Sequence, residues 1–401
     1  MMAGVLFAQG VDGIDVDTTP PPPPPSARGR QPSTSAQYAE VDAGWGRLTR
    51  TRWTHWLSIA LFVLIVAASA VLCIYDNEHI QAGLHGDEAE SGIEARNLNS
   101  GRYNTLLGVG WYDQPLPSFL VQAVGLRLFG NTVSGLRTTS AVVSLLTLPL
   151  VFLLARKLFG TRVAFLTLTL MAFAHWFIAY AHIGINYNQT TLLEVLAMLA
   201  FWHGWQTKQR RWFVVSGVVT GVGLYVYFAS RVVPILLLTF AGILWLWQRR
   251  NAIAGLASRC AQPALQVQSV AIWASAMILV FAPMGVFFLN HAKEFGSRAD
   301  FVFLFSDTQL YSRDQKLLLY TGTTDIPAAL SVQVYRYGVL FNVGGDRSGQ
   351  YGNQLPLLEY LSGALCVLGL ALALRHARQP RFMLLLVWIV LTVIIGHFRL
   401  G

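Results

Sequence analysis

The residue types best suited to chemistry lie in one polar segment, residues 85–118, directly after the first long apolar run. The segment contains the carboxylates of Asp87 and Asp113. A positioned carboxylate outside lipid can act as a general base toward a hydroxyl group. Read as a helix, Asp87, Glu90 and Glu94 share one face, because they are three and four residues apart. A solvated surface helix explains the same spacing, so both interpretations stay open.

Four side chains elsewhere are suited to hold a phosphate group beside those carboxylates. Arg137 begins the second apolar run, and His182 directly follows the third. Tyr227 ends the fifth run and Arg231 lies just after it. Charged groups cost roughly 2.5–3.5 kcal/mol in a bilayer core, so those that persist near apolar runs are candidates for function. The alternative for each is an interfacial anchor or a snorkelling side chain.

A divalent metal is an open alternative for the same carboxylates. Asp87, Glu88 and Asp113 could supply the oxygen ligands that a hard cation prefers, or could form a metal-free acid/base set. No other cofactor is indicated. The three cysteines have no metal-ligand spacing and no nearby partner, so the sequence predicts neither a zinc site nor a disulfide framework.

The composition indicates that lipid surrounds much of the chain. Charged residues make up 12% and apolar residues 54% of its 401 residues, and the mean hydropathy is +0.47. An average soluble protein has roughly 25% charged residues. The net charge of +9 could suggest nucleic acid, but its distribution between apolar runs is typical of membrane topology.

Apolar runs near the ~20 residues that a membrane-spanning helix needs recur nine times. We therefore predict an all-α polytopic membrane protein with about nine spans, and an interfacial or bundle-packed helix for the short run 117–129. The predicted spans are residues 57–75, 134–154, 163–181, 190–206, 212–229, 232–247, 269–289, 357–374 and 382–398.

Charge in the connections predicts the direction of the spans. Arginine and lysine fill every second connection, which by the positive-inside rule lies in the cytoplasm. The Pro-rich tail, residues 1–52, is predicted to be disordered and cytoplasmic, and residues 53–401 to form the membrane domain. The loops 76–133 and 290–356 are then extracytoplasmic, the first catalytic.

The second outer loop, residues 290–356, combines mixed charge, aromatic residues and glycines. Loops of this length in compact proteins are usually functional or disordered, and the aromatic content argues against disorder. We expect it to fold over the outer pocket as a lid. Asp346 and Arg347 in its glycine-rich part are further candidate site residues.

Several motifs, taken in order, resemble the GT-C superfamily of polyprenyl-phosphate-sugar-dependent glycosyltransferases. The resemblance covers about residues 57–400 and is greatest to the branch, glycosyltransferase family 39, of protein O-mannosyltransferases and the lipid A aminoarabinose transferase. The motifs are His-Gly-Asp-Glu-Ala at 85–89, Trp-Tyr-Asp-Gln-Pro-Leu-Pro at 111–117, Leu-Phe-Gly at 128–130, Leu-Arg at 136–137, Leu-Ala-Arg-Lys-Leu-Phe-Gly at 154–160, the stretch 225–234 and Gly-Asp-Arg at 345–347.

The resemblance implies a GT-C-like bundle with outer loop helices, and a sugar donor on a polyprenyl phosphate. By similarity Asp87 would take the proton of an acceptor hydroxyl on a lipid, glycan or protein, with inversion at the anomeric carbon. Arg137 and Arg231 would contact the phosphate, and Asp113 matches an acidic position near the donor or a metal. Two positions depart from the pattern: Gln114 stands where relatives often carry lysine, and His182 where many carry arginine.

Two other functions fit the same topology. A transporter or flippase for a lipid-linked sugar should show internal repeats or charges at mid-span, whereas the charges here cluster at one side. An inactive relative that acts as an assembly partner is the other alternative, which Gln114 keeps open.

Overall fold

The computed structural model describes residues 52–80, 83–253, 264–308, 310–345 and 355–397. The chain divides into two units, residues 1–59 and 60–401. Of the first unit only residues 52–59 are described, and they begin helix α2 (Arg52–Ile74). The predicted disordered tail, apart from its last residue, and the candidates Asp346 and Arg347 lie outside the described residues.

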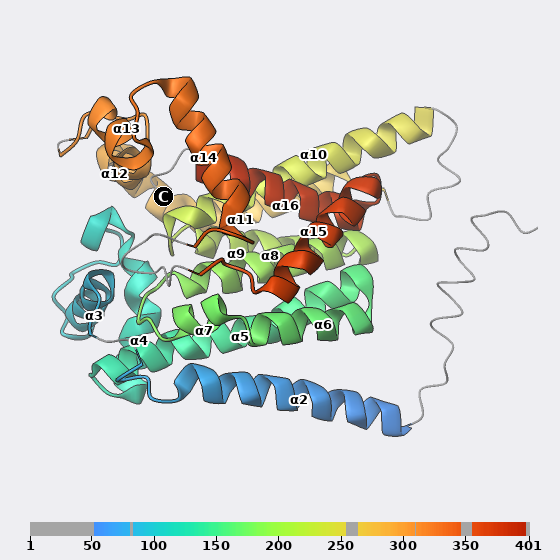
Figure 1. Ribbon diagram of the computed structural model, residues 1–401, viewed down its shortest axis with the longest axis horizontal. Coiled ribbons are helices and arrows are strands. Elements are labelled where there is room, and N and C mark those ends of the chain that lie inside the picture. Colours follow the sequence, from blue (N-terminus) through green and yellow to red (C-terminus); the bar gives the residue numbers. More distant parts are fainter. Residues whose placement is uncertain (1–51, 81–82, 254–263, 309, 346–354, 398–401) are drawn as a thin grey trace, which may run out of the picture. The chain divides into compact units, whose positions relative to one another are not determined.

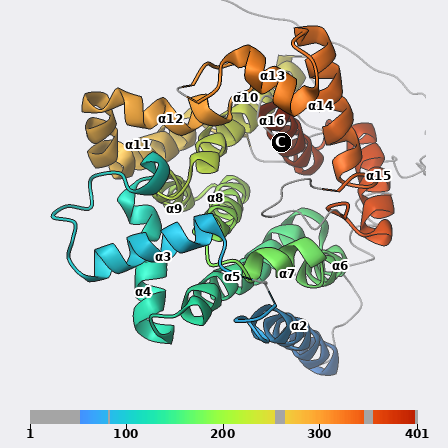
Figure 2. The same ribbon diagram turned by 60° about the vertical axis from the view of Figure 1, so that its left-hand side comes forward.

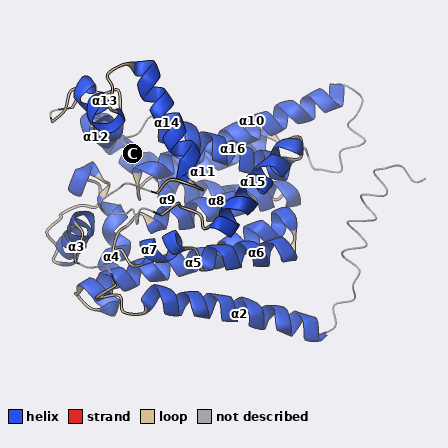
Figure 3. Cartoon of the chain, in the orientation of Figure 1, coloured by secondary structure: helices blue, strands red, loops and turns tan. Residues whose placement is uncertain are grey.

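Helices make up the regular structure of the described ranges, which contain no strand, and Val109 and Pro115 form an isolated bridge (Figure 3). Each of the nine predicted spans coincides with a helix or a pair of helices. They are α2, α5 (Val133–Phe159), α6 (Thr161–Ala172) with α7 (His175–Ala181), α8 (Asn188–Thr207), α9 (Arg210–Gly223), α10 (Val232–Ile253), α11 (Val267–Asn290), α15 (Tyr360–Arg375) and α16 (Pro380–His397) (Figure 1).

The predicted number of nine membrane spans is not confirmed. Within the described residues four helices are long and apolar enough to cross a membrane, in α2, α5, α10 and α11. A fifth is reached if α6 and α7, bent by 58° at a short break, count as one span. Helix α9 has 14 residues, which at ~1.5 Å each cover about 21 Å, less than the ~30 Å of a hydrocarbon core.

Shorter helices occupy the connections that the charge pattern predicts to be outside. The first loop contains α3 (Gly86–Asn99), the 3₁₀ turns η1 (Trp111–Asp113) and η2 (Leu116–Phe119), and α4 (Leu120–Phe129). The second contains α12 (Ala292–Val302), α13 (Arg313–Thr321) and α14 (Ile326–Leu340). Figures 1 and 2 show α3 and α4 at the same end of the long helices as α12 and α13.

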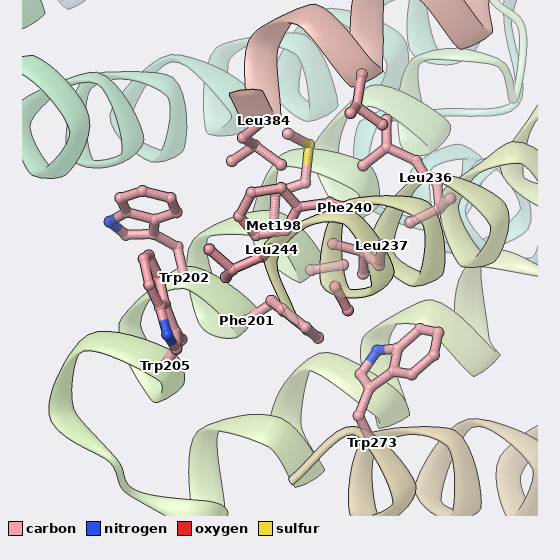
Figure 4. Packing of buried hydrophobic residues seen from close by; sticks show 14 of the residues in the cluster. Met198, Phe201, Trp202, Trp205, Leu236, Leu237, Phe240, Leu244, Trp273 and Leu384 are labelled. Carbon is pink, nitrogen blue, oxygen red and sulfur yellow. The ribbon is translucent and has the colours of Figure 1, made fainter. Parts of the chain in front are cut away.

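A cluster of aromatic and aliphatic side chains forms the largest core, between α8, α9, α10, α11 and α16 (Figure 4). Trp205 and Trp273 are almost completely buried there. Two glycines let α9 approach α11 closely, because a Cβ on Gly217 would lie 2.2 Å from the Trp273 carbonyl oxygen and one on Gly221 2.8 Å from that of Met277. Small residues four apart serve this purpose in membrane helices.

Capping interactions fix where the site helices begin. His85 caps α3: its Nδ1 accepts from the Asp87 amide at 3.1 Å, while its own amide donates to Glu88 Oε2 at 3.4 Å. Thr132 caps α5 by accepting from the Gly135 amide at 3.0 Å. Because both starts are defined, the side chains of the first turns of α3 and α5 take fixed directions.

Candidate functional site

Asp87 lies in the first turn of α3, partly buried, and faces the turn that precedes α8. Tyr187 Oη donates to its Oδ2 at 3.2 Å. The Tyr187 ring packs on that of Tyr227, with centroids 4.1 Å apart. Asp87 and Tyr227 were separate candidates in the sequence. In the structure Tyr187, which was not a candidate, contacts both.

Glu88, the next residue of α3, forms a buried ion pair with Arg137 on α5. Both side chains are 1% exposed. The pair is bidentate, with Arg137 Nε 2.7 Å from Oε1 and Nη2 3.0 Å from Oε2 of the carboxylate. The amide of Gly184 adds a third donor to Glu88 at 2.8 Å. Such a satisfied pair holds α3 against α5 and the turn that precedes α8.

Arg137 also donates to three backbone carbonyls of the segment that links α2 to α3. Nη1 donates to Asn77 and Glu78, and Nη2 to Gly83, over 2.9–3.3 Å. A guanidinium has five N–H groups, and this arrangement employs all of them. Both side chains therefore contribute to the position of α3, and the predicted roles of Glu88 in catalysis and Arg137 in phosphate binding stay predictions.

His182 is likewise part of the scaffold. It is 2% exposed, and its Nε2 lies 2.9 Å from the carbonyl oxygen of Leu72 on α2. A carbonyl can only accept, so the ring proton is on Nε2. Burial lowers the pKa of His182, which favours the neutral ring. The phosphate contact predicted for His182 stays a prediction, and the contact that the structure gives its Nε2 is with this carbonyl.

The loop that carries Asp113 is held to α3 by Glu94. This buried carboxylate accepts from the Trp111 amide at 2.9 Å and from the Tyr103 hydroxyl. Burial, together with the hydrogen bond to Glu94, raises the pKa of Tyr103. Tyr112 and Asp113 both have left-handed backbones, with φ of 51° and 55°. Non-glycine residues in this conformation are rare and recur at functional sites.

The neighbouring Gln114 is tied into the same region. It is 1% exposed, and its Oε1 accepts from Asn186 Nδ2 at 2.8 Å. Asn186 precedes Tyr187, so this bond places the Asp113 loop beside the Asp87–Tyr187 contact. The position where relatives often carry lysine is thus held by a neutral amide pair.

Arg231 ends the turn η3 (Phe228–Arg231) and is partly buried. Its Nη1 donates to the carbonyl oxygen of Phe295 on α12 at 2.8 Å. The guanidinium carbon lies 3.8 Å from the Phe295 ring centroid and 4.7 Å from that of Phe228. In the part of the chain that is described, no carboxylate lies within ion-pairing distance of Arg231. Aromatic faces thus hold this cation, and no carboxylate neutralises it.

An apolar pocket of about 410 Å³ adjoins Tyr187. Hydroxyl and amide side chains of α5 and α8 line one part of its wall, and aromatic and aliphatic side chains line the rest. The end of the second outer loop contributes to the wall. The lining residues are Ser144, Thr147, Met171, Trp176, Phe177, Tyr180, Tyr187, Asn188, Thr191, Phe341, Leu357 and Leu358.

The predicted metal set is not assembled in the described residues. They contain no group of three or more His, Cys, Asp or Glu side chains that could hold a metal ion. Glu88 binds Arg137, as described above, while Asp87 binds Tyr187.

Comparison with known proteins shows similarity to glycosyltransferases in part of the sequence and in the fold. Residues 113–273 match the profile of the family described as dolichyl-phosphate-mannose-protein mannosyltransferase. An undecaprenyl phosphate-alpha-4-amino-4-deoxy-L-arabinose arabinosyl transferase of Pseudomonas aeruginosa is 29% identical over 153 residues, 36% of this chain and 27% of that protein. One from Pseudomonas savastanoi is 29% identical over 182 residues, 42% of this chain and 33% of that protein. The matches span a third or less of these relatives.

Solved structures extend the fold similarity over most of the chain. ArnT from Cupriavidus metallidurans, bound to undecaprenyl phosphate, aligns with a TM-score of 0.53 at 16% identity and covers 87% of this chain and 56% of that one. The apo oligosaccharyltransferase of Archaeoglobus fulgidus aligns with 0.51 at 13% identity, covering 87% and 48%. The chain therefore shares its fold with these glycosyltransferases, and its residues 113–273 match the mannosyltransferase profile.

Tyr187 and Asn186, which connect the outer segments, were not among the residues selected from the sequence. The segment 180–189 did show a concentration of polar and aromatic residues after the third apolar run. That composition was a usable signal, but it could not tell which side chain faces Asp87. Asn188 in the same segment has a structural role, since its amide donates to Ser144 Oγ and to the Tyr180 carbonyl, each at 2.9 Å.

Proposed function

We propose that this chain is an integral-membrane glycosyltransferase that moves a sugar from a polyprenyl-phosphate donor to an acceptor hydroxyl. The observation that carries the proposal is one continuous chain of contacts. It runs from the Asp87 carboxylate through the hydroxyl of Tyr187 and the ring of Tyr227 to Phe228, whose ring meets Arg231. The proposed base and a cation that no carboxylate of the described residues pairs with therefore belong to one site.

In the proposed reaction, the residues at the two ends of this series of contacts have different roles. Asp87 accepts the proton of the acceptor hydroxyl, whose oxygen forms a new bond to the anomeric carbon. The bond from that carbon to the phosphate oxygen breaks on the opposite face, which inverts the configuration, and the lipid phosphate leaves with the electron pair. Arg231 stabilises the phosphate charge that develops. Asp113 stays a candidate for orienting the donor sugar.

The apolar pocket supplies a place for the prenyl chain. It lies directly against Tyr187, and its aromatic and aliphatic wall suits an isoprenoid. The structurally similar ArnT is bound to undecaprenyl phosphate. For this chain the same class of lipid would enter through the pocket and present its phosphate toward Arg231.

The contacts of the second outer loop support our proposal that it acts as a lid. Helix α12 contributes the Phe295 carbonyl and ring to Arg231, and Phe301 packs on Tyr112 with centroids 5.8 Å apart. Phe341 of the loop lines the apolar pocket, together with Leu357 and Leu358 directly after the loop. A segment that touches the cation, the acidic loop and the pocket can cover bound donor.

We place this site on the extracytoplasmic side of the cell membrane, with the N-terminus in the cytoplasm, from the positive-inside rule. The exposed Ser100, which caps the end of α3, offers a test. A cysteine at Ser100 should react with a membrane-impermeant maleimide in intact cells. Protection until the membrane is permeabilised would reverse the orientation.

A transfer assay tests the function. Purified protein in lipid nanodiscs receives undecaprenyl-phosphate carrying a labelled sugar, and release of undecaprenyl phosphate is followed. We expect release by the wild type and loss of release by Asp87→Asn. Glu90→Gln is the matched control, because Glu90 lies on the same helix and has no assigned role. Absence of release by the wild type with any lipid-phosphate sugar, or full release by Asp87→Asn, would contradict the proposal.

A further inference from the structure

Tyr187 contacts three parts of the proposed site: the base, the neighbouring aromatic ring and the apolar pocket. Its hydroxyl donates to Asp87 Oδ2, its ring packs on Tyr227, and its side chain lines the apolar pocket. We propose that Tyr187 is a positioning residue that orients the Asp87 carboxylate. The inference rests on the proposed function, with Asp87 as the base, and assigns a role that the resemblance does not give.

The backbone on both sides of Tyr187 is fastened to other elements. Asn186 donates to Gln114 Oε1 at 2.8 Å, which ties it to the acidic loop. Asn188 donates to Ser144 Oγ on α5 at 2.9 Å. A tyrosine between two fastened neighbours can move little, and its ring is further confined by packing against Tyr227. The phenol therefore meets Asp87 from a fixed direction.

The carboxylate it meets is also fixed, since α3 is held at its first turn. The amide of Asp87 donates to His85 Nδ1, and the adjacent Glu88 is anchored by Arg137. The charged groups packed around Asp87 thus include a neutralised pair, Glu88 with Arg137, and an imidazole that serves as helix cap. Of these contacts, the hydrogen bond from the Tyr187 hydroxyl is the one that a conservative substitution can remove without changing the others.

A hydrogen bond to an ionised acceptor is worth more than one to a neutral acceptor. Donation from Tyr187 therefore stabilises charged Asp87 over protonated Asp87. Side-chain packing alone would favour neither form.

The experiment measures carbodiimide labelling of Asp87 against pH, resolved by peptide mass spectrometry, in the full-length protein. Carbodiimides react with protonated carboxyl groups, and the measurement needs no catalysis. Tyr187→Phe keeps the ring and should raise the labelling midpoint by about half to one pH unit. Tyr225→Phe is the matched control, because that hydroxyl bonds the Val280 carbonyl at 2.8 Å, and its midpoint should equal the wild type.

A second variant covers the case in which Tyr187→Phe does not fold. Incorporating 3-fluorotyrosine at position 187 retains the hydroxyl and makes it a stronger donor, so the midpoint should fall below that of the wild type. Equal midpoints in the wild type and in whichever of these variants folds would overturn the inference.

Activity then separates the inference from the function on which it rests. In active protein, Tyr187→Phe should shift the acidic limb of the rate profile to higher pH and lower kcat while the donor KM stays unchanged. Wild-type protein that transfers no sugar would refute the proposed function and leave the labelling result valid. Transfer that needs Asp87 but has the same pH profile in Tyr187→Phe would refute the inference alone.

Discussion

Two adjacent carboxylates on α3 have opposite environments. Glu88 is 1% exposed, paired with Arg137 and supplied with the Gly184 amide. Asp87, one residue earlier, is partly buried and contacts a phenol beside an apolar pocket. Successive residues of a helix point about 100° apart, so one can fasten the helix while the other faces a site. The scaffold carboxylate is neutralised by a cation, whereas the proposed base is not paired with Arg137.

The two arginines repeat this contrast. Arg137 is saturated by one carboxylate and by backbone carbonyls. Arg231 is held by aromatic rings and one carbonyl, and no described carboxylate pairs with it. From the sequence we predicted that both bind phosphate, because each is an arginine beside an apolar run. Their partners separate them, and those partners are distant in sequence.

Breaking the scaffold pair should give the largest effect on stability. Glu88→Ala or Arg137→Ala leaves a buried charge without its partner and should lower the free energy of unfolding by about 3–5 kcal/mol. Thermal unfolding in detergent measures this. The double variant should lose less than the sum of the single losses, since it leaves no unpaired charge. Additive losses would mean that the two side chains do not act as a pair.

Arg231→Gln should act on the donor and leave the fold largely intact. Removal of a cation from a phosphate weakens binding by about 1.5–3 kcal/mol, or roughly 10–100-fold in Kd. Titration with undecaprenyl phosphate measures the Kd, and thermal unfolding should stay close to the wild type. If Arg137→Lys weakened donor binding as much as Arg231→Gln does, the division between the two arginines would fail.

Gln114→Leu should have an intermediate effect on stability. It leaves the buried Asn186 amide without its acceptor, at a cost of about 1–3 kcal/mol. Adding Asn186→Leu should recover part of this loss, because the second change removes the unpaired group. An unaltered unfolding temperature in Gln114→Leu would show that this amide pair does not secure the acidic loop.

The smallest effect on stability is expected for the partly exposed pair of Glu359 and His175. Glu359, which caps α15, accepts from the amide and from Nδ1 of His175 on α7, at 2.9 and 3.0 Å. Both side chains are partly exposed, and such pairs contribute about 0.2–1 kcal/mol. Glu359→Gln should therefore change thermal unfolding only slightly, far less than Glu88→Ala. A loss comparable to that of the buried pair would contradict the ranking by burial.

Sequence patterns predicted where the helices lie better than what each polar residue does. Apolar runs located nine helices or helix pairs, since hydrophobic periodicity is a local property. Their lengths and bends depend on packing, so the short α9 and the bent α6–α7 pair were counted as full spans. The acidic segment was located from composition. The separate roles of Asp87 and Glu88 could not be predicted from composition, because their partners Tyr187 and Arg137 are about 100 and 49 residues away in sequence.

The single-turnover rate of sugar transfer tests the central claim most directly. Wild type, Asp87→Asn and Glu90→Gln are first saturated with donor, so that differences in binding do not enter. Loss of a positioned base should slow transfer by roughly 10²–10⁴-fold in Asp87→Asn, while Glu90→Gln stays near the wild-type rate. An Asp87→Asn rate within about threefold of the wild type would contradict the assignment of Asp87 as the base, since that factor is far below what base catalysis contributes.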